Sequence, residues 1–119
     1  MKRIEAITLY STIKDLKAPE LISEVFEKYI NLRIKLKDNF KEYQKYSDEL
    51  KEQTKPTDWK EGDDVSSWNQ KFKPLMEKHL SDEIKLDCKI FTAKDIVSMT
   101  EKNNLNGEVM DTIAELMIK

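Results

Sequence analysis

The chain has 119 residues, 37% of them charged and 39% hydrophobic, and a formal net charge of −2. This length fits one domain over residues 1–119, and two Gly and three Pro favour helices over a turn-rich β architecture. The balanced charge argues against a protein whose main task is neutralising phosphates. One cysteine excludes an intramolecular disulfide, and no apolar run approaches the ~20 residues that span a bilayer. We therefore expect a soluble, cytoplasmic protein without a signal peptide or membrane segment.

The first elements in chain order are a short helix and a long one. Apolar residues from Ile4 to Ile13 have helical spacing, and Pro19 suits the first turn of the next helix. A seven-residue repeat then predicts one long helix over 19–53 with a single apolar seam, as in a coiled coil. The seam consists of Ile22, Val25, Tyr29, Leu32, Leu36, Asn39, Tyr43, Tyr46 and Leu50.

Two details of this helix bear on its surroundings. The apolar residues Leu21, Phe26, Ile30 and Ile34 widen the seam in its first half, so this half is expected to contact neighbours on two sides. Asn39 is the one amide among the seam positions. It either sets the register of a buried seam or marks where the seam leaves the core.

The middle of the chain predicts a helical hairpin. Residues 55–64 have the composition of a connection, and Trp59 within it is expected to fold back on the helix. Helical spacing returns over 65–80, where Pro74 is expected to kink or split the helix. The hairpin then packs residues 19–53 against 65–80, unless a second molecule covers the seam and makes a homo-oligomer.

The last third changes its periodicity. Residues 83–91 alternate apolar and charged side chains, the rhythm of a half-buried strand. Such a strand would pair with residues 1–6; the alternatives are extended packing or a helix tail. Thr92 with Asp95 predicts the cap of one helix, and Asn106 can cap a final one. We expect a mainly α fold: a long hairpin, short C-terminal helices and at most a small two-stranded β element.

Few residues offer covalent or metal chemistry. His79, the only histidine, lies on the apolar side of its helix, and Cys88 lies on the apolar face of the predicted strand, so both are expected to pack. Two soft ligands are too few for a zinc site. The acidic turn Glu61–Asp64 lacks calcium-loop spacing, and no phosphate-binding glycine loop is present. We expect no catalytic residue, metal or cofactor, and no enzyme.

Two sets of residues are candidates for binding. The aromatic residues belong in or beside the core, and any that stays exposed is a natural anchor for a partner protein: Tyr43, Tyr46, Trp59 and Trp68. A basic row four residues apart would lie on one helix side and follow a nucleic-acid backbone: Arg33, Lys37, Lys41 and Lys45. Ion pairs of Lys41 with Asp38 and of Lys45 with Glu42 on a solvated face explain the same row equally.

Several stretches follow one another in an order that has a known parallel. They are Ala6-Ile7-Thr8-Leu9, Tyr43-Gln44-Lys45-Tyr46 at the end of the long helix, Trp68-Asn69-Gln70-Lys71-Phe72, Glu83-Ile84-Lys85-Leu86-Asp87, and Ile113-Ala114-Glu115-Leu116-Met117-Ile118. In this order the chain resembles small, uncharacterised helical proteins encoded by tailed phages and prophages. The resemblance covers most of the chain and carries over no catalytic residue.

The resemblance implies a phage gene product in the bacterial cytoplasm that acts by stoichiometric protein binding. Its partner would be a phage structural protein, in virion assembly, or a host defence protein, which it would inhibit as anti-CRISPR proteins do. The alternative function is nucleic-acid binding through the basic row.

Overall fold

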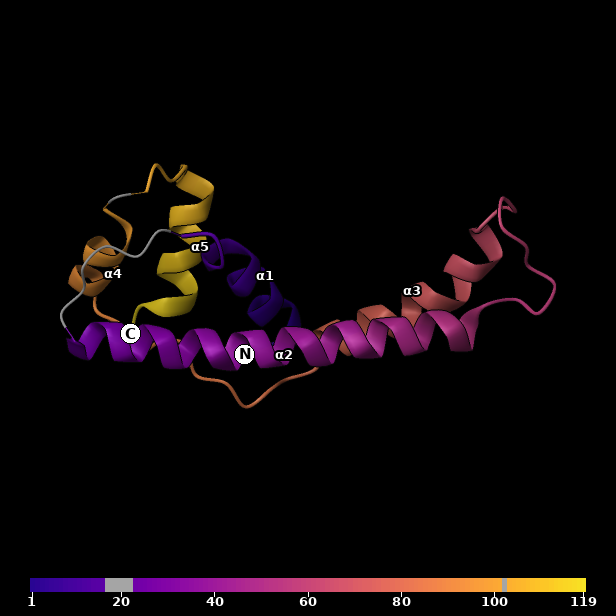
Figure 1. The fold of residues 1–119 in the computed structure, drawn as a ribbon, viewed down its shortest axis with the longest axis horizontal. Coiled ribbons are helices and arrows are strands. Elements are labelled where there is room, and N and C mark those ends of the chain that lie inside the picture. Colours follow the sequence, from indigo (N-terminus) through magenta and orange to yellow (C-terminus); the bar gives the residue numbers. More distant parts are fainter. Residues whose placement is uncertain (17–22, 102) are drawn as a thin grey trace.

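The computed structural model describes residues 1–16, 23–101 and 103–119. It contains the helices α1 (Arg3–Ile13), α2 (Ser23–Thr54), α3 (Ser66–Ser81), α4 (Ala93–Thr100) and α5 (Gly107–Met117), so the fold is mainly α, as expected. Figure 1 shows α1, α4 and α5 gathered over the first half of α2, while α3 folds back along its second half. We call residues 43–81 the arm and the other described residues the body.

The molecule is elongated. It measures 57 × 28 × 20 Å, and its radius of gyration is 17.8 Å. A compact domain of this length has a radius of gyration of about 13.5 Å. The excess comes from the arm, where two helices lie together and α1 reaches only their base (Figure 1).

The predicted seam of α2 is confirmed over its described part. The buried members are Val25, Tyr29, Leu32, Leu36 and Leu50, while Asn39, Tyr43 and Tyr46 are half-buried. Ile22 lies outside the described residues. Asn39 marks the point where the seam leaves the body core, because Leu36 is the last residue of α2 in that core. In the hairpin, α3 packs against the second half of α2 and not against its first half. The described part of the seam is thus covered by elements of the same chain.

The apolar residues that widen the seam of α2 are not covered by a second neighbour. Phe26, Ile30 and Ile34 are exposed, Ile34 to 53%. The reason is the layering of the body: α1 contacts α2, α5 packs on α1, and α4 packs on α5. These helices stack on one side of α2, and residues 85–90 run along a second flank beside Lys28, Asn31 and Lys35. No described element covers the face that carries Phe26, Ile30 and Ile34. Leu21 lies outside the described residues.

The body core draws on all parts of the sequence except the arm. Its fully buried large side chains are Leu9, Ile13, Leu36, Cys88, Phe91, Ile113 and Met117. Burying a side chain of this size stabilises the fold by about 1.5–3 kcal/mol. The core therefore holds α1, α2, α4 and α5 together across sequence separations of about a hundred residues.

The predicted strand forms only at its ends. Lys2 and Glu83 make a single antiparallel bridge, with the Ile84 amide donating to the Met1 carbonyl at 2.8 Å. The predicted strand pairing with residues 1–6 is thus limited to this one bridge, because α1 begins at Arg3, and residues 84–90 are instead extended packing. Between the bridges, the side chains of residues 84–90 still alternate between inside and outside. Phe91 then makes a parallel bridge with Ile118.

Helix ends and breaks follow local chemistry. The Asp95 amide donates to Thr92 Oγ1 and the Thr92 amide to Asp95 Oδ2, both at 3.1 Å, and Asn106 Oδ1 accepts from the Val109 amide at 2.9 Å. Both predicted caps are confirmed. Pro74 does not split its helix: α3 continues through it, and Pro74 lies on the exposed side, where water can solvate the carbonyl left without a donor. Among the described residues, no helix has the length and apolarity needed to cross a bilayer.

Candidate protein-binding surface

Two tryptophans close the outer end of the arm. Trp68 Nε1 donates to the Lys51 carbonyl and to Thr54 Oγ1, both at 3.1 Å, which ties α3 to the last turn of α2. Trp59 folds back from the connection, as predicted, and packs edge-on against Trp68 with ring centroids 5.0 Å apart. Lys55 Nζ lies 5.5 Å and 6.0 Å from the centroids of the two indoles.

The acidic connection forms turns. Asp63 Oδ2 accepts from the Lys60 amide at 2.8 Å. Asp64 Oδ1 accepts from the Ser66 amide and hydroxyl at 2.9 Å and 2.7 Å, and these bonds lower the pKa of Asp64. No group of three potential metal-ligating side chains forms within residues 1–16, 23–101 and 103–119. The carboxylates here start α3, as acidic groups at a helix N-terminus do.

An apolar strip runs along the arm beside Trp68. It consists of Val65, Trp68, Phe72 and Leu75, which are three, four and three residues apart and therefore lie on one side of α3. Leu75 is 45% exposed and Val65 nearly as much, while the two aromatic side chains are half-buried. A cleft of about 210 Å³ opens along it, lined by Lys51, Val65, Trp68, Asn69 and Phe72. Aromatic side chains around a small apolar cleft are typical of binding hot spots.

Tyr43 and Tyr46 lie at the base of the arm and are used internally. The Tyr46 ring stacks on the imidazole of His79 with centroids 3.7 Å apart, and Tyr43 lies 6.4 Å from the same imidazole. Arg3 Nη1 contacts His79 Nδ1 at 3.0 Å and donates to the His79 carbonyl at 2.7 Å. Burial and the Arg3 charge lower the pKa of His79. Tyr43 and Tyr46 of α2 and His79 of α3 therefore lie where the two helices of the arm meet α1.

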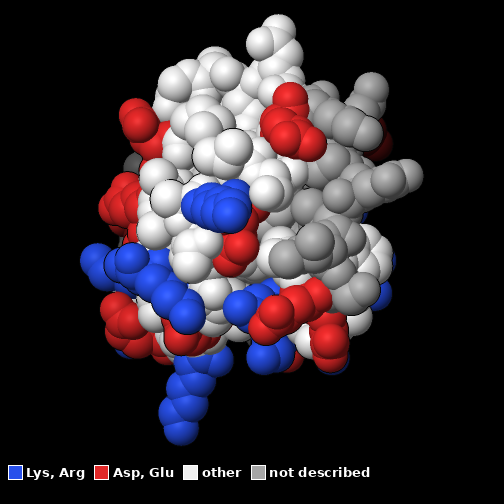
Figure 2. Space-filling model, turned by 90° about the vertical axis from the view of Figure 1, so that its left-hand side faces the viewer, with Lys and Arg blue, Asp and Glu red and all other residues white. Residues whose placement is uncertain are grey.

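The basic row is not continuous. Arg33 donates to the Lys14 carbonyl at 2.7 Å and to the Tyr29 hydroxyl at 3.3 Å, so it joins α1 to α2. Lys37, Lys41 and Lys45 are exposed. The expected ion pairs with Asp38 and Glu42 do not form: the ion pairs of the described part of the chain involve Met1 with Glu83 and Arg3 with Asp82. Figure 2 shows the body end-on, with acidic and basic side chains mixed over its lower half and no large patch of one sign.

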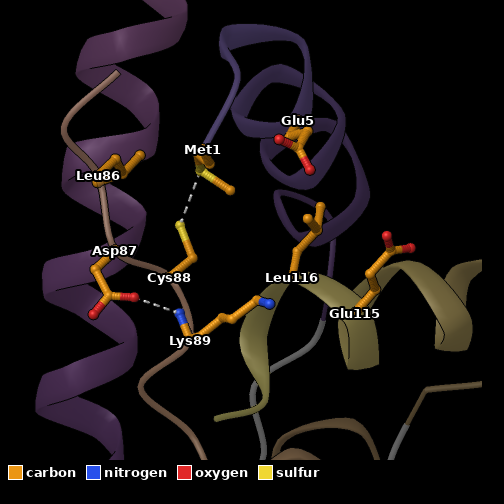
Figure 3. Close-up of a pocket in the computed structure, with 8 residues that line it drawn as sticks. All are labelled: Met1, Glu5, Leu86, Asp87, Cys88, Lys89, Glu115 and Leu116. Carbon is orange, nitrogen blue, oxygen red and sulfur yellow. Dashed lines mark hydrogen bonds between the residues drawn. The ribbon is translucent and has the colours of Figure 1, made fainter. Parts of the chain in front are cut away.

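A second hollow, of about 290 Å³, lies in the body around Cys88 (Figure 3). Cys88 Sγ lies 3.6 Å from Met1 Sδ, and burial together with Asp87 raises the thiol pKa to about 11. Such a thiol is a poor nucleophile. Glu5 on α1 and Glu115 on α5 border the same hollow beside Leu116 (Figure 3).

Sequence reasoning identified part of this surface. It named Trp59 and Trp68, which the structure brings together, but it did not name Val65, Phe72 or Leu75 as binding residues. Their helical spacing indicated a side of residues 65–80 that packs, but not how much of it stays exposed. The exposure of the strip depends on the arm being only two helices thick, and the sequence signal for this is the small number of apolar residues in the second half of α2.

Comparisons with known proteins give no match: no family model, curated protein or solved structure is significantly similar to this chain. Its own geometry is therefore the basis of any functional inference.

Proposed function

We propose that this chain is a non-enzymatic, stoichiometric protein-binding factor of a tailed phage or prophage, and that the arm is its binding element. The observation that carries the proposal is the apolar strip with its cleft on a projecting two-helix arm. Leu75 is 45% exposed, so burying the rest of this side chain at a contact is worth about half of the ~1.5–3 kcal/mol of full burial, roughly 1 kcal/mol. The phage setting and the bacterial cytoplasm come from the resemblance of element order. Within that setting the partner is a phage structural protein or a host defence protein.

The groups best suited to chemistry support binding over catalysis. His79 is stacked on Tyr46 and bonded to Arg3, with no hydroxyl, thiol or carboxylate hydrogen-bonded to its ring within the described chain. The Cys88 thiol is buried, with a pKa of about 11. A general base or nucleophile needs a reacting group within hydrogen-bond reach and a pKa near the working pH.

Affinity capture from phage-carrying bacteria tests the proposal. The baits are the wild type, Leu75→Asp in the strip, and Val97→Asp as a matched control, because Val97 is 61% exposed on α4 outside the arm. We expect one protein to be recovered with the wild type and the control and lost with Leu75→Asp. Circular dichroism checks that all three fold. Recovery with all three baits, or with none, would contradict the arm as the binding element.

Nucleic-acid binding is the alternative function. It has weaker support, because Arg33 is engaged with α1 and the three exposed lysines alternate with Asp38 and Glu42 along the helix. It predicts binding to a DNA or RNA oligonucleotide that weakens steeply with salt and is lost in a triple variant, Lys37→Glu, Lys41→Glu and Lys45→Glu. Fluorescence anisotropy of labelled oligonucleotides measures both.

A further inference from the structure

We propose that the arm of one molecule docks on the acidic face of α5 in a second copy, so that copies join head to tail. This inference rests on the proposed function, in which the arm is the binding element, and names a second copy as the occupant of the cleft while no other partner is bound. It follows from two surfaces of the same chain that carry opposite charge, each beside exposed apolar side chains.

The first surface is the apolar strip, which is bordered by four lysines: Lys51, Lys55, Lys71 and Lys78. Lys51 lines the cleft, and Lys55 lies over the Trp68 ring. Lys71 is three residues after Trp68 and four before Leu75, and Lys78 is three after Leu75, so both lie beside the strip. All four are exposed, and none makes an ion pair within the described residues. Asp64, four residues before Trp68, lies at the same spacing, so the strip is an apolar cleft bordered by more lysines than carboxylates.

The second surface is the outer face of α5. Glu108, Asp111 and Glu115 are three and four residues apart, so they share one face, and all are exposed. No Lys or Arg occurs in Gly107–Met117. Like charges at these spacings repel one another, and within the described chain no cation relieves them.

A groove of about 220 Å³ runs beside these carboxylates, between α1 and α5. Its lining includes Ile4, Glu5, Glu115 and Leu116, and Ile4 is exposed. Glu5 and Glu115 also border the hollow of Figure 3, which Lys89 lines as well. This face offers apolar contact and negative charge together.

The two surfaces fit each other in chemistry and cannot meet within one molecule. The strip lies in the arm, whereas α5 lies in the body near the other end of the long axis (Figure 1). An apolar strip alone would accept a neutral partner equally well. The lysines beside it favour an acidic helix with apolar neighbours. The helix α5 of a second copy has both properties. Because two different surfaces meet, the contact is heterologous and builds a ring or an open chain.

A charge exchange tests this pairing. The first variant carries Lys51→Glu and Lys71→Glu, which cancels the net positive charge of the four lysines around the strip; the second carries Asp111→Lys and Glu115→Lys, which makes α5 basic. Sedimentation velocity at low salt, about 50 mM, measures mass where surface charges are weakly screened. We expect the wild type to associate above its monomer mass of 14.1 kDa as concentration rises. Each variant alone should remain a monomer, because one of its two surfaces no longer attracts the other. An equimolar mixture should associate again, because the unchanged strip of the second variant can meet the unchanged α5 of the first.

The matched control carries Lys37→Glu and Lys41→Glu, the same charge change on an exposed part of α2 outside the arm. It should associate as the wild type does. Leu75→Asp gives an independent disruption that leaves the lysines in place. Both tryptophans of the chain lie at the cleft, so association should also shift Trp emission, which a contact elsewhere would leave unchanged.

Two results would overturn the inference: a wild type that stays monomeric at every concentration, or a mixture of variants that stays monomeric while the wild type associates. These results are separable from failure of the proposed function. If the wild type is monomeric and Leu75→Asp still loses a captured protein, only the second copy is wrong as the occupant. If the wild type is monomeric and capture does not depend on Leu75, both proposals fall.

Discussion

His79 lies flat on Tyr46, with ring centroids 3.7 Å apart and planes inclined by 14°, at the point where the arm meets the body. Arg3 of α1 contacts the same imidazole at Nδ1 and also reaches the carboxylate of Asp82 at 3.4 Å. Nδ1 can accept from the guanidinium only while the imidazole is neutral. The joint between α1, α2 and α3 therefore depends on the protonation state of one side chain.

This joint predicts a pH-dependent stability. The pKa of His79 is lowered by burial and then by Arg3, with Asp82 acting in the opposite sense. In the unfolded chain His79 takes up a proton near pH 6.5, whereas the folded chain does so only at lower pH. The free energy of unfolding should thus fall as pH drops through 6.5 and level off below the folded pKa.

Urea unfolding between about pH 7.5 and pH 5.5 measures this change, because carboxylates titrate mostly below that window. A His79→Gln variant removes the titrating group and keeps a polar side chain. Its free energy of unfolding should vary less with pH than that of the wild type. Equal pH dependence in the two proteins would show that His79 is not the group responsible.

Truncation of two nearby residues of α2 should change the free energy of unfolding by very different amounts. Leu36 is 1% exposed in the body core, and Ile34 is exposed on the outer face. Leu36→Ala should lower the free energy of unfolding by about 3 kcal/mol, from lost burial and the cavity left behind. Ile34→Ala should change it by less than about 0.5 kcal/mol. Urea midpoints at low protein concentration decide this, and similar losses would mean that the outer face of α2 is covered.

The two tryptophans of the arm should also differ. Trp68→Phe keeps an aromatic ring but removes the donor that serves the Lys51 carbonyl and Thr54 Oγ1. We expect a loss of about 1 kcal/mol and faster hydrogen exchange in the last turn of α2. Trp59→Phe removes only an exposed bond of 3.3 Å to the Asp64 carbonyl, so its effect should be smaller. The reverse order would contradict the role assigned to Trp68.

Cys88 should be unreactive in the folded chain. Its pKa of about 11 leaves roughly one thiol in a thousand ionised at pH 8, and the side chain is 2% exposed. Ellman's reagent at that pH should therefore react slowly with the native protein and rapidly in urea. A fast reaction in buffer would mean that the hollow around Cys88 opens readily.

Local chemistry made much of the fold predictable. The seam of α2, the Thr92–Asp95 cap and the Asn106 cap depend on residues within one or two turns of each other, and each is confirmed. Residues 83–91 show the limit of such patterns. Their alternation correctly predicts which side chains face inward, but a ladder also needs a partner strand, and the chain start becomes helical at Arg3.

What covers each apolar face was not predictable. Ile30 and Ile34 are apolar residues of the same helix as the buried seam, but no described element reaches them. Tyr46 and Trp68 were named together as partner anchors, yet Tyr46 stacks on His79 while Trp68 borders an open cleft. The difference between the two residues depends on how far α1 extends along α2 toward the arm. No short-range sequence pattern encodes this.

The connection between α2 and α3 lies at the outer end of the arm, far from the body core, so the chain can be cut there without touching that core. A protease cut between Thr57 and Asp63, in an exposed stretch, would divide the chain so that Leu9 and Leu36 stay on one fragment and Phe91 and Ile113 on the other. Neither fragment can bury its half of the core alone. The nicked protein should hence elute as one species and separate only in denaturant, and the two halves made separately should reconstitute it.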